Sequence, residues 1–256
     1  MEFPFKAIGF DWAHTLTDLG EEGDRLPLKK VFAHLKAKQI ALPDFEVCLN
    51  KSRELFRPMI EQSRKTHREA HYEDVLQYLL FYFKIPWQGK VSLQELLQVY
   101  YREVYQERQV FPEANNVLQQ LSQWGISMGI ISNTTNPVFM KELELEDSGL
   151  KKYFDFTIYS SGVPFRKPHP SIFQLAISHF ELEPCEILFV GDSLSADILG
   201  AQEVGIKTAW INRKNEQTDI VPDYELTSLE DLLRIHWVEA WATSFLFLPN
   251  KLSATE

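Results

Sequence analysis

The feature that most constrains the fold is an alternation of short apolar runs with segments of helical spacing, which continues from Val110 to Ile235. The apolar runs predict buried strands, because they are short and bounded by polar or turn residues. They cover residues 126–131, 156–159, 186–190 and 208–211, and an earlier run covers 7–10. Strands that alternate with helices are typical of a parallel sheet with helices on both faces. The sequence therefore predicts an α/β fold built on a doubly wound parallel sheet.

The stretch between the first run and Val110 has a different character. Residues 19–109 contain no convincing strand, and their apolar residues recur at helical spacing in stretches 24–40, 43–70, 72–85 and 92–109. We expect two domains: an α/β core of residues 1–18 and 110–256, and an all-helical domain of residues 19–109.

Composition excludes several classes of function. The 256-residue chain carries a net charge of −10, which argues against nucleic-acid binding because such binding rests on basic surface. We identify no signal peptide and no apolar stretch long enough to span a membrane. Cys48 and Cys185 are far apart and lack metal-ligand spacing, which favours free thiols in a reducing cytoplasm. We expect a cytoplasmic monomer or homodimer with no nucleic-acid or membrane partner.

Polar side chains follow the expected strands or lie in the next loop. They are Asp11, Ser132, Asn133, Lys167, Asp192 and Asp197. The carboxyl ends of parallel strands meet at one edge of a sheet, where ligands bind in open α/β folds. Two carboxylates there, Asp11 and Asp192, would hold Mg²⁺, which takes few protein ligands and completes its shell with water and phosphate oxygens.

The same residues suit phosphoryl transfer. Ser132 would donate hydrogen bonds to phosphate oxygens, and Lys167 would neutralise phosphate charge and restrain the Asp11 carboxylate. Asp11 would attack phosphorus to form an aspartyl-phosphate, which water then hydrolyses.

These segments resemble, in order, the four motifs of the haloacid dehalogenase (HAD) superfamily. They are Asp11-Trp12-Ala13-His14-Thr15, Ile130-Ile131-Ser132-Asn133, Lys167-Pro168-His169-Pro170, and Gly191-Asp192-Ser193 with Asp197. The resemblance covers about residues 6–18 and 110–235, and the helical insertion lies where this family has a cap over the active site. It implies a Rossmann-like HAD core with a helical cap that opens, closes and largely selects the substrate.

The resemblance also implies a role for each matching residue. Asp11 would be the nucleophile and a Mg²⁺ ligand, Asp192 a second ligand, and the backbone carbonyl of Ala13 a third. Asp197 would support the metal site or the lysine. The substrate phosphate would be bound by Thr15, Ser132, Asn133 and Lys167.

The sequence departs from the family pattern at one catalytic position. Phosphatases of this family carry a second aspartate, the general acid and base, where this chain has Ala13. A positioned general acid–base contributes roughly 10²–10⁴ in rate, so its loss raises the barrier by about 3–5 kcal/mol. His14 is the adjacent candidate, since an imidazole can transfer protons near neutral pH.

We therefore expect a Mg²⁺-dependent, phosphatase-type HAD hydrolase that acts on a small phosphorylated metabolite, and three alternatives stay open. Phosphonoacetaldehyde hydrolases are similar at Asp11-Trp12-Ala13 and Thr15, and they form a Schiff base on a cap lysine, for which Lys51 is the candidate. 2-Haloacid dehalogenases also lack the second aspartate. A catalytically impaired protein that binds a phosphorylated ligand is the third alternative.

Overall fold

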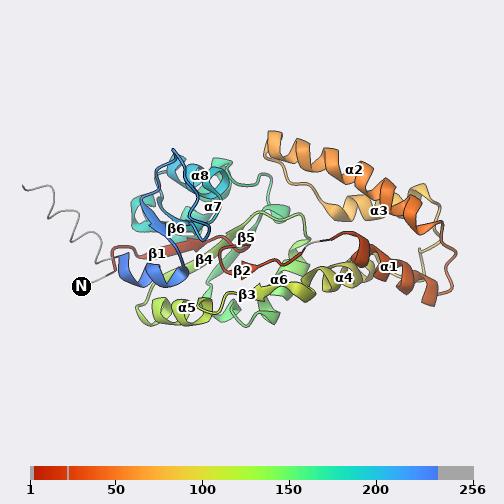
Figure 1. The fold of residues 1–256 in the computed structure, drawn as a ribbon, viewed down its shortest axis with the longest axis horizontal. Coiled ribbons are helices and arrows are strands. Elements are labelled where there is room, and N and C mark those ends of the chain that lie inside the picture. Colours follow the sequence, from red (N-terminus) through yellow and green to blue (C-terminus); the bar gives the residue numbers. More distant parts are fainter. Residues whose placement is uncertain (1–2, 22, 236–256) are drawn as a thin grey trace, which may run out of the picture.

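The structure, a computed structural model, describes residues 3–21 and 23–235. Residues 236–256, which the sequence assigns to the end of the core, lie outside the described part of the chain. The overall shape has two parts, with the sheet and its helices at one end and a group of helices at the other (Figure 1).

The core is a six-stranded sheet in which every pair of neighbouring strands is parallel. In spatial order the strands are β5 (Phe156–Tyr159), β4 (Ser127–Ser132), β1 (Ala7–Phe10), β6 (Ile187–Gly191), β7 (Lys207–Ile211) and β8 (Tyr224–Leu226). The first strand of the chain thus lies in the middle of the sheet. Phe10 at its end is paired with Ile130 of β4 and Val190 of β6, so the loops after these three strands emerge at the same edge.

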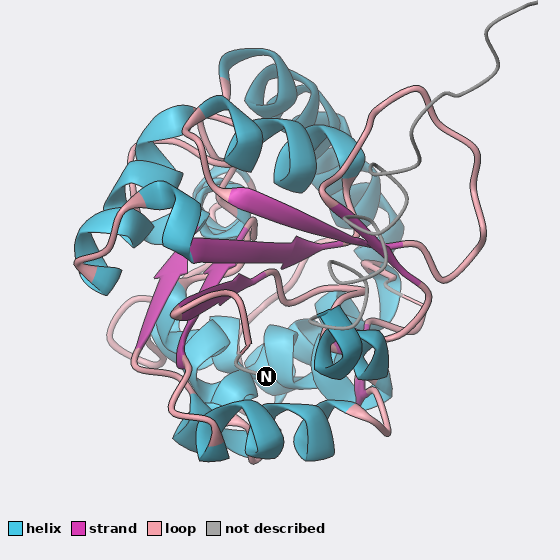
Figure 2. Ribbon diagram, turned by 90° about the vertical axis from the view of Figure 1, so that its left-hand side faces the viewer, coloured by secondary structure: helices cyan, strands magenta, loops and turns pink. Residues whose placement is uncertain are grey.

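Helices cover both faces of the sheet, as Figure 2 shows. On one face pack α5 (Ala114–Gln123), α6 (Val138–Asp147) and a 3₁₀ helix (Leu229–Arg234). On the other pack α7 (Pro170–Phe180) and α8 (Leu199–Glu203). Two apolar cores, one on each face, explain why the central strands β1 and β6 are apolar along their whole length rather than at alternate positions. The predicted doubly wound α/β fold is confirmed.

The described residues between Asp18 and Gln109 include four α-helices that share a hydrophobic core of their own. They are α1 (Arg25–Ala37), α2 (Phe45–Thr66), α3 (Tyr72–Tyr82) and α4 (Leu93–Val104). Asp44 and Ser92 are the N-cap residues of α2 and α4. Their side chains accept hydrogen bonds from the backbone N–H groups of Val47 and Glu95. Met140 of α6 also packs into this core, so the helical part rests on the sheet domain beside the Ser132 loop.

The observed elements differ from the sequence expectation in small ways. A short antiparallel ribbon joins the two ends of the helical insertion. It consists of β2 (Thr17–Asp18) and β3 (Gln109–Val110), with two residues in each strand. The helix expected over 196–204 begins instead as a π-helical turn, Leu194–Ile198, before α8. π-Turns are frequent at functional sites, and this one contains Asp197. The last helix, expected over 228–235, is 3₁₀ in character.

Both cysteines are free thiols, as predicted, with Cys48 buried and Cys185 exposed. Across residues 3–21 and 23–235, no helix has the length and apolar character needed to cross a bilayer.

Candidate active site

The central strands bring two carboxylates to one edge of the sheet. Asp11 directly follows β1, Asp192 directly follows β6, and these strands are neighbours. The backbone N–H of Asp11 donates to the carbonyl of Val190 (2.9 Å), which extends the pairing to the last residue before the turn. Asp11 is almost completely buried. The geometry is the one expected from strand ends in a parallel sheet.

Lys167 lies at the centre of the site and is buried. Its Nζ lies 2.7 Å from Asp11 Oδ1, 2.7 Å from Asp197 Oδ1 and 2.7 Å from the carbonyl oxygen of Ile131. Burial disfavours the ammonium form, but the charges of Asp11 and Asp197 outweigh burial and raise the pKa of Lys167. The side chain is therefore a fixed cation held between two acidic residues from different loops.

The loop that carries Lys167 is held by Asn133. The Asn133 side-chain amide donates to the carbonyl of Lys167 (2.9 Å), and the Lys167 backbone N–H donates back to Asn133 Oδ1 (2.8 Å). This pair of hydrogen bonds joins the loop after β4 to the loop before α7. The structure thus places Asn133 as a support for Lys167, which adds to the phosphate contact expected from the sequence.

Three carboxylates form a cluster that could hold a metal ion. One oxygen from each of Asp11, Asp192 and Asp197 lies within 4.8 Å of the others. Burial and the charges of Asp11 and Asp197 raise the pKa of Asp192 to about 7. Burial and the charge of Asp11 also raise the pKa of Asp197, to about 6, against the opposing effect of Lys167. The cluster is therefore short of positive charge, and its hard oxygen donors fit Mg²⁺.

Asp197 is already engaged by the protein. Besides the ion pair with Lys167, its Oδ2 accepts from the backbone N–H of Ser193 (2.9 Å). A Cβ atom on Gly191 would lie 2.4 Å from Asp197 Oδ2, so only glycine at 191 permits this approach. Asp11 and Asp192 are thus the carboxylates best placed to hold a cation, with Asp197 behind them.

A cavity of about 230 Å³ lies between the sheet domain and the helical part, and it is lined by Ala13 and Arg166, which neighbour Asp11 and Lys167 in the sequence. The sheet domain contributes Ala13, Ser132, Asn133, Lys141 and Arg166, whereas α2 and the segment after it contribute Ile60, Arg64 and Glu69. Four of the residues that line the cavity are arginine or lysine, which suits an anionic ligand: Arg64, Arg108, Lys141 and Arg166.

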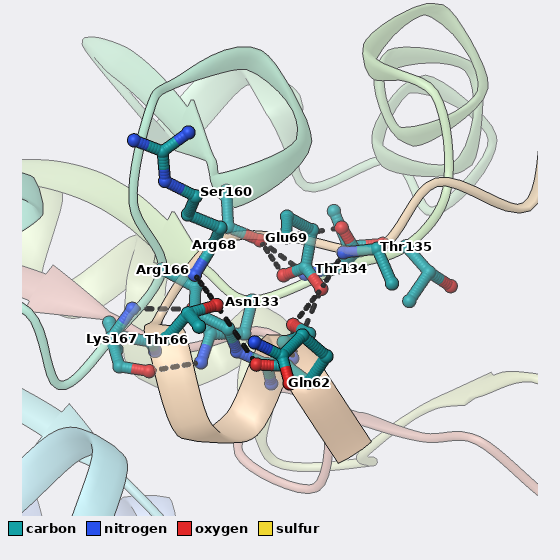
Figure 3. Close-up of polar contacts among 12 residues, drawn as sticks. Gln62, Thr66, Arg68, Glu69, Asn133, Thr134, Thr135, Ser160, Arg166 and Lys167 are labelled. Atoms are coloured by element: carbon teal, nitrogen blue, oxygen red, sulfur yellow. Dashed lines mark hydrogen bonds and ion pairs between the residues drawn. The ribbon is translucent and has the colours of Figure 1, made fainter. Parts of the chain in front are cut away.

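Glu69 joins the helical part to the sheet domain at the rim of this cavity (Figure 3). Its carboxylate accepts hydrogen bonds from Ser160 Oγ and from Arg166 Nη1 (3.0 Å). The backbone N–H of Arg166 donates to the carbonyl of His67 (2.8 Å). The segment after α2 therefore contacts Arg166, the residue next to Lys167.

The remaining predicted residues lie in different places. Thr15 is fully buried, and its Oγ1 has no hydrogen-bond partner within the described residues. His14 is exposed and lines a separate cavity that it shares with Asp192. Lys51 pairs with Glu54 (2.8 Å) and does not line the cavity beside Ala13. That hydrogen bond raises the pKa of Lys51, the opposite of what a Schiff-base lysine needs.

Sequence reasoning missed a buried polar cluster on α6. Lys141 Nζ donates to Glu144 Oε2 (2.6 Å), and Glu144 Oε1 accepts from Trp12 Nε1 (2.9 Å) and from Arg108. The available signal was a lysine and a glutamate three residues apart in a helix, which is typical of a surface pair. Nothing in that spacing indicates that both are buried next to the Asp11 strand.

A family model for haloacid dehalogenase-like hydrolases matches residues 28–211. The chain belongs to this family. It is 30% identical over 245 residues to the glyceraldehyde 3-phosphate phosphatase of Pyrococcus furiosus, covering 90% of this chain and 92% of that protein. The suspected family is thus confirmed, and the chain is a HAD-family hydrolase.

Solved structures of the family have the same fold. The HAD phosphatase from Thermococcus onnurineus matches with a TM-score of 0.58 at 28% identity, covering 91% of this chain and 98% of that one. The 2-haloacid dehalogenase from Pseudomonas syringae pv. tomato matches with a TM-score of 0.66 at 22% identity, covering 93% and 99%. This second likeness concerns the fold alone.

In this HAD-family hydrolase, we expect the substitution Asn133→Ala to lower the free energy of unfolding by about 1–3 kcal/mol, because it leaves the buried backbone groups of Lys167 unpaired. Chemical denaturation measures the change. Asn50→Ala on the exposed surface of α2 is the matched control, with an expected change within about 0.5 kcal/mol. Equal effects for the two variants would contradict the supporting role of Asn133.

Proposed function

We propose that the protein is a Mg²⁺-dependent phosphatase that hydrolyses a small phosphorylated metabolite through an aspartyl-phosphate on Asp11. The observation that carries the proposal is the buried Lys167 ammonium, which fixes the Asp11 carboxylate at the sheet edge. Lys167 binds Oδ1 of Asp11, and we assign the attack on phosphorus to the other oxygen, Oδ2. A carboxylate that is oriented in this way is preorganised for nucleophilic catalysis.

The phosphoryl group is bound by residues around Asp11. Ser132 ends β4, lies beside the cavity and can donate its hydroxyl to a phosphate oxygen. Thr15, with its buried Oγ1, and Asn133 complete the set of neutral donors. Lys167 supplies the positive charge that balances the added phosphate.

Asp11, Asp192 and the backbone carbonyl of Ala13 are the groups that hold Mg²⁺ in this proposal, with Asp197 in support. When bound, Mg²⁺ supplies positive charge that stabilises the phosphoryl oxygens during transfer. The raised pKa of Asp192, caused by burial and neighbouring carboxylates, supports a cation here, because a cation would favour the ionised form of every member of the cluster.

The helical residues 19–109 act as a cap in this proposal. The cavity between cap and core holds about 230 Å³, which suits a metabolite of a few carbon atoms. The Pyrococcus furiosus relative is named for a three-carbon phosphorylated aldehyde, and compounds of that size are the first candidates. The partner is thus a small phosphorylated molecule that enters when the cap separates from the core.

The main prediction concerns phosphate release from small phosphomonoesters, including glyceraldehyde 3-phosphate. We expect turnover with Mg²⁺ and none with EDTA, and we expect Asp11→Asn to abolish it, because an amide cannot act as the nucleophile. Asp219→Asn, in an exposed loop, is the matched control and should retain the parental rate. Phosphonoacetaldehyde belongs in the same panel, since turnover of that compound alone would instead favour the phosphonatase alternative.

A second prediction concerns the cation itself. Asp192→Asn removes a charged oxygen ligand, and we expect Mg²⁺ affinity measured by calorimetry to fall by about tenfold or more, in the range seen when groups around a metal are changed. Asp219→Asn again serves as the control. Binding of Mg²⁺ that is equally tight in the Asp192→Asn variant would rule out this residue as a ligand.

A further inference from the structure

The alanine at position 13 leaves the proposed reaction without its usual proton donor. Another group that can donate a proton, a lysine ammonium, lines the cavity. Lys141 on α6 lines the same cavity as Ala13 and Ser132. Its side chain is only 4% exposed, and its Nζ donates to Glu144 Oε2 at 2.6 Å. An ammonium group with further N–H bonds therefore lies among the residues that line the cavity next to the Asp11 loop.

The surroundings of Lys141 come from several elements. Glu144 of α6 and Arg108, before β3, supply the nearest charges, and Nζ lies 5.4 Å from the ring centre of Trp12 and 5.9 Å from that of Tyr159. Burial and the charge of Arg108 lower the pKa of Lys141, whereas Glu144 and Asp11 oppose that change. The N–H bonds of Nζ that Glu144 does not take up can donate a proton, and the amine that this leaves can accept one during turnover.

The other ionisable groups at this cavity are less suited to proton transfer. Arg64, Arg108 and Arg166 hold their protons too tightly, because a guanidinium does not deprotonate in proteins. Glu69 is occupied by Ser160 and Arg166. His14, the candidate from the sequence, lines the neighbouring cavity with Asp192 and is not among the residues that line the cavity of Ala13 and Ser132.

We propose that Lys141 is the general acid and base that takes the place of the aspartate missing at position 13. This role rests on the proposed function. As Asp11 Oδ2 forms a bond to phosphorus, the bond from phosphorus to the leaving oxygen breaks and its electron pair stays on that oxygen. The Lys141 ammonium gives this oxygen a proton and becomes a neutral amine. The amine then takes a proton from the water that attacks phosphorus, which releases phosphate, frees the Asp11 carboxylate and restores the ammonium.

The leaving group decides whether a general acid is needed, so two substrates of similar size test the role. Ethyl phosphate must expel an alkoxide, which needs a proton, whereas acetyl phosphate expels acetate, which does not. The measurement is the single-turnover rate of ethanol or acetate release. For Lys141→Met we expect the ratio of the ethyl phosphate rate to the acetyl phosphate rate to fall by about 10²–10⁴. Lys90→Met, at an exposed position, should leave the ratio unchanged.

Two further variants separate proton transfer from charge or packing. Lys141→Arg keeps the charge beside Glu144 but does not release a proton, so its ratio should fall as far as that of Lys141→Met. Adding Ala13→Asp to Lys141→Met should restore ethyl phosphate turnover, because the aspartate occupies the position used by the family's phosphatases.

Three results would overturn the role of Lys141. They are an equal loss for both substrates in Lys141→Met, no loss for either, or a normal ratio in Lys141→Arg. If the parent protein released neither product in an Asp11-dependent manner, the proposed phosphatase function would itself fail, and the role of Lys141 with it.

Discussion

The site depends on one buried cation. The Lys167 ammonium contacts Asp11, Asp197 and the carbonyl of Ile131, each at 2.7 Å. These partners come from the ends of β1 and β4 and from the π-helical turn after β6, so one side chain joins three loops. Breaking such a contact leaves a buried charge unpaired, which is strongly destabilising. The arrangement of the sheet edge therefore requires Lys167, and Lys167 in turn requires the sheet order that brings those loops together.

Two polar systems lie near the end of β1. One is the acidic cluster around Lys167, which carries the proposed nucleophile and cation site. The other is the pair formed by Lys141 and Glu144 on α6, tied to the first through the hydrogen bond from Trp12, the neighbour of Asp11, to Glu144. Nucleophile and proposed proton donor are thus positioned by different elements. In the proposed reaction, alanine is therefore compatible with position 13, because Lys141 of α6 lines the same cavity.

Much of this could be predicted from sequence, for a physical reason. Asp11 and Asp192 follow short apolar runs that predict buried strands, and parallel strands bring their carboxyl ends together. Lys141 could not be predicted in this way, because helical spacing does not tell which face a charged pair occupies when an inserted domain packs over it. His14 shows that adjacency in the sequence does not ensure a shared cavity. It follows Ala13, but its backbone is left-handed (φ 59°) and it lines a different cavity from Ala13.

The central claim is that Asp11 becomes phosphorylated during turnover. The direct test is to mix the enzyme with a phosphomonoester that it hydrolyses, quench the reaction rapidly with acid, and analyse the digested protein by mass spectrometry. An acyl phosphate survives brief exposure to acid. We predict a phosphoryl group on the peptide that contains Asp11, and none on that peptide in the Asp11→Asn variant. Turnover without any phosphoryl group on this peptide, or with the group on another residue, would contradict it.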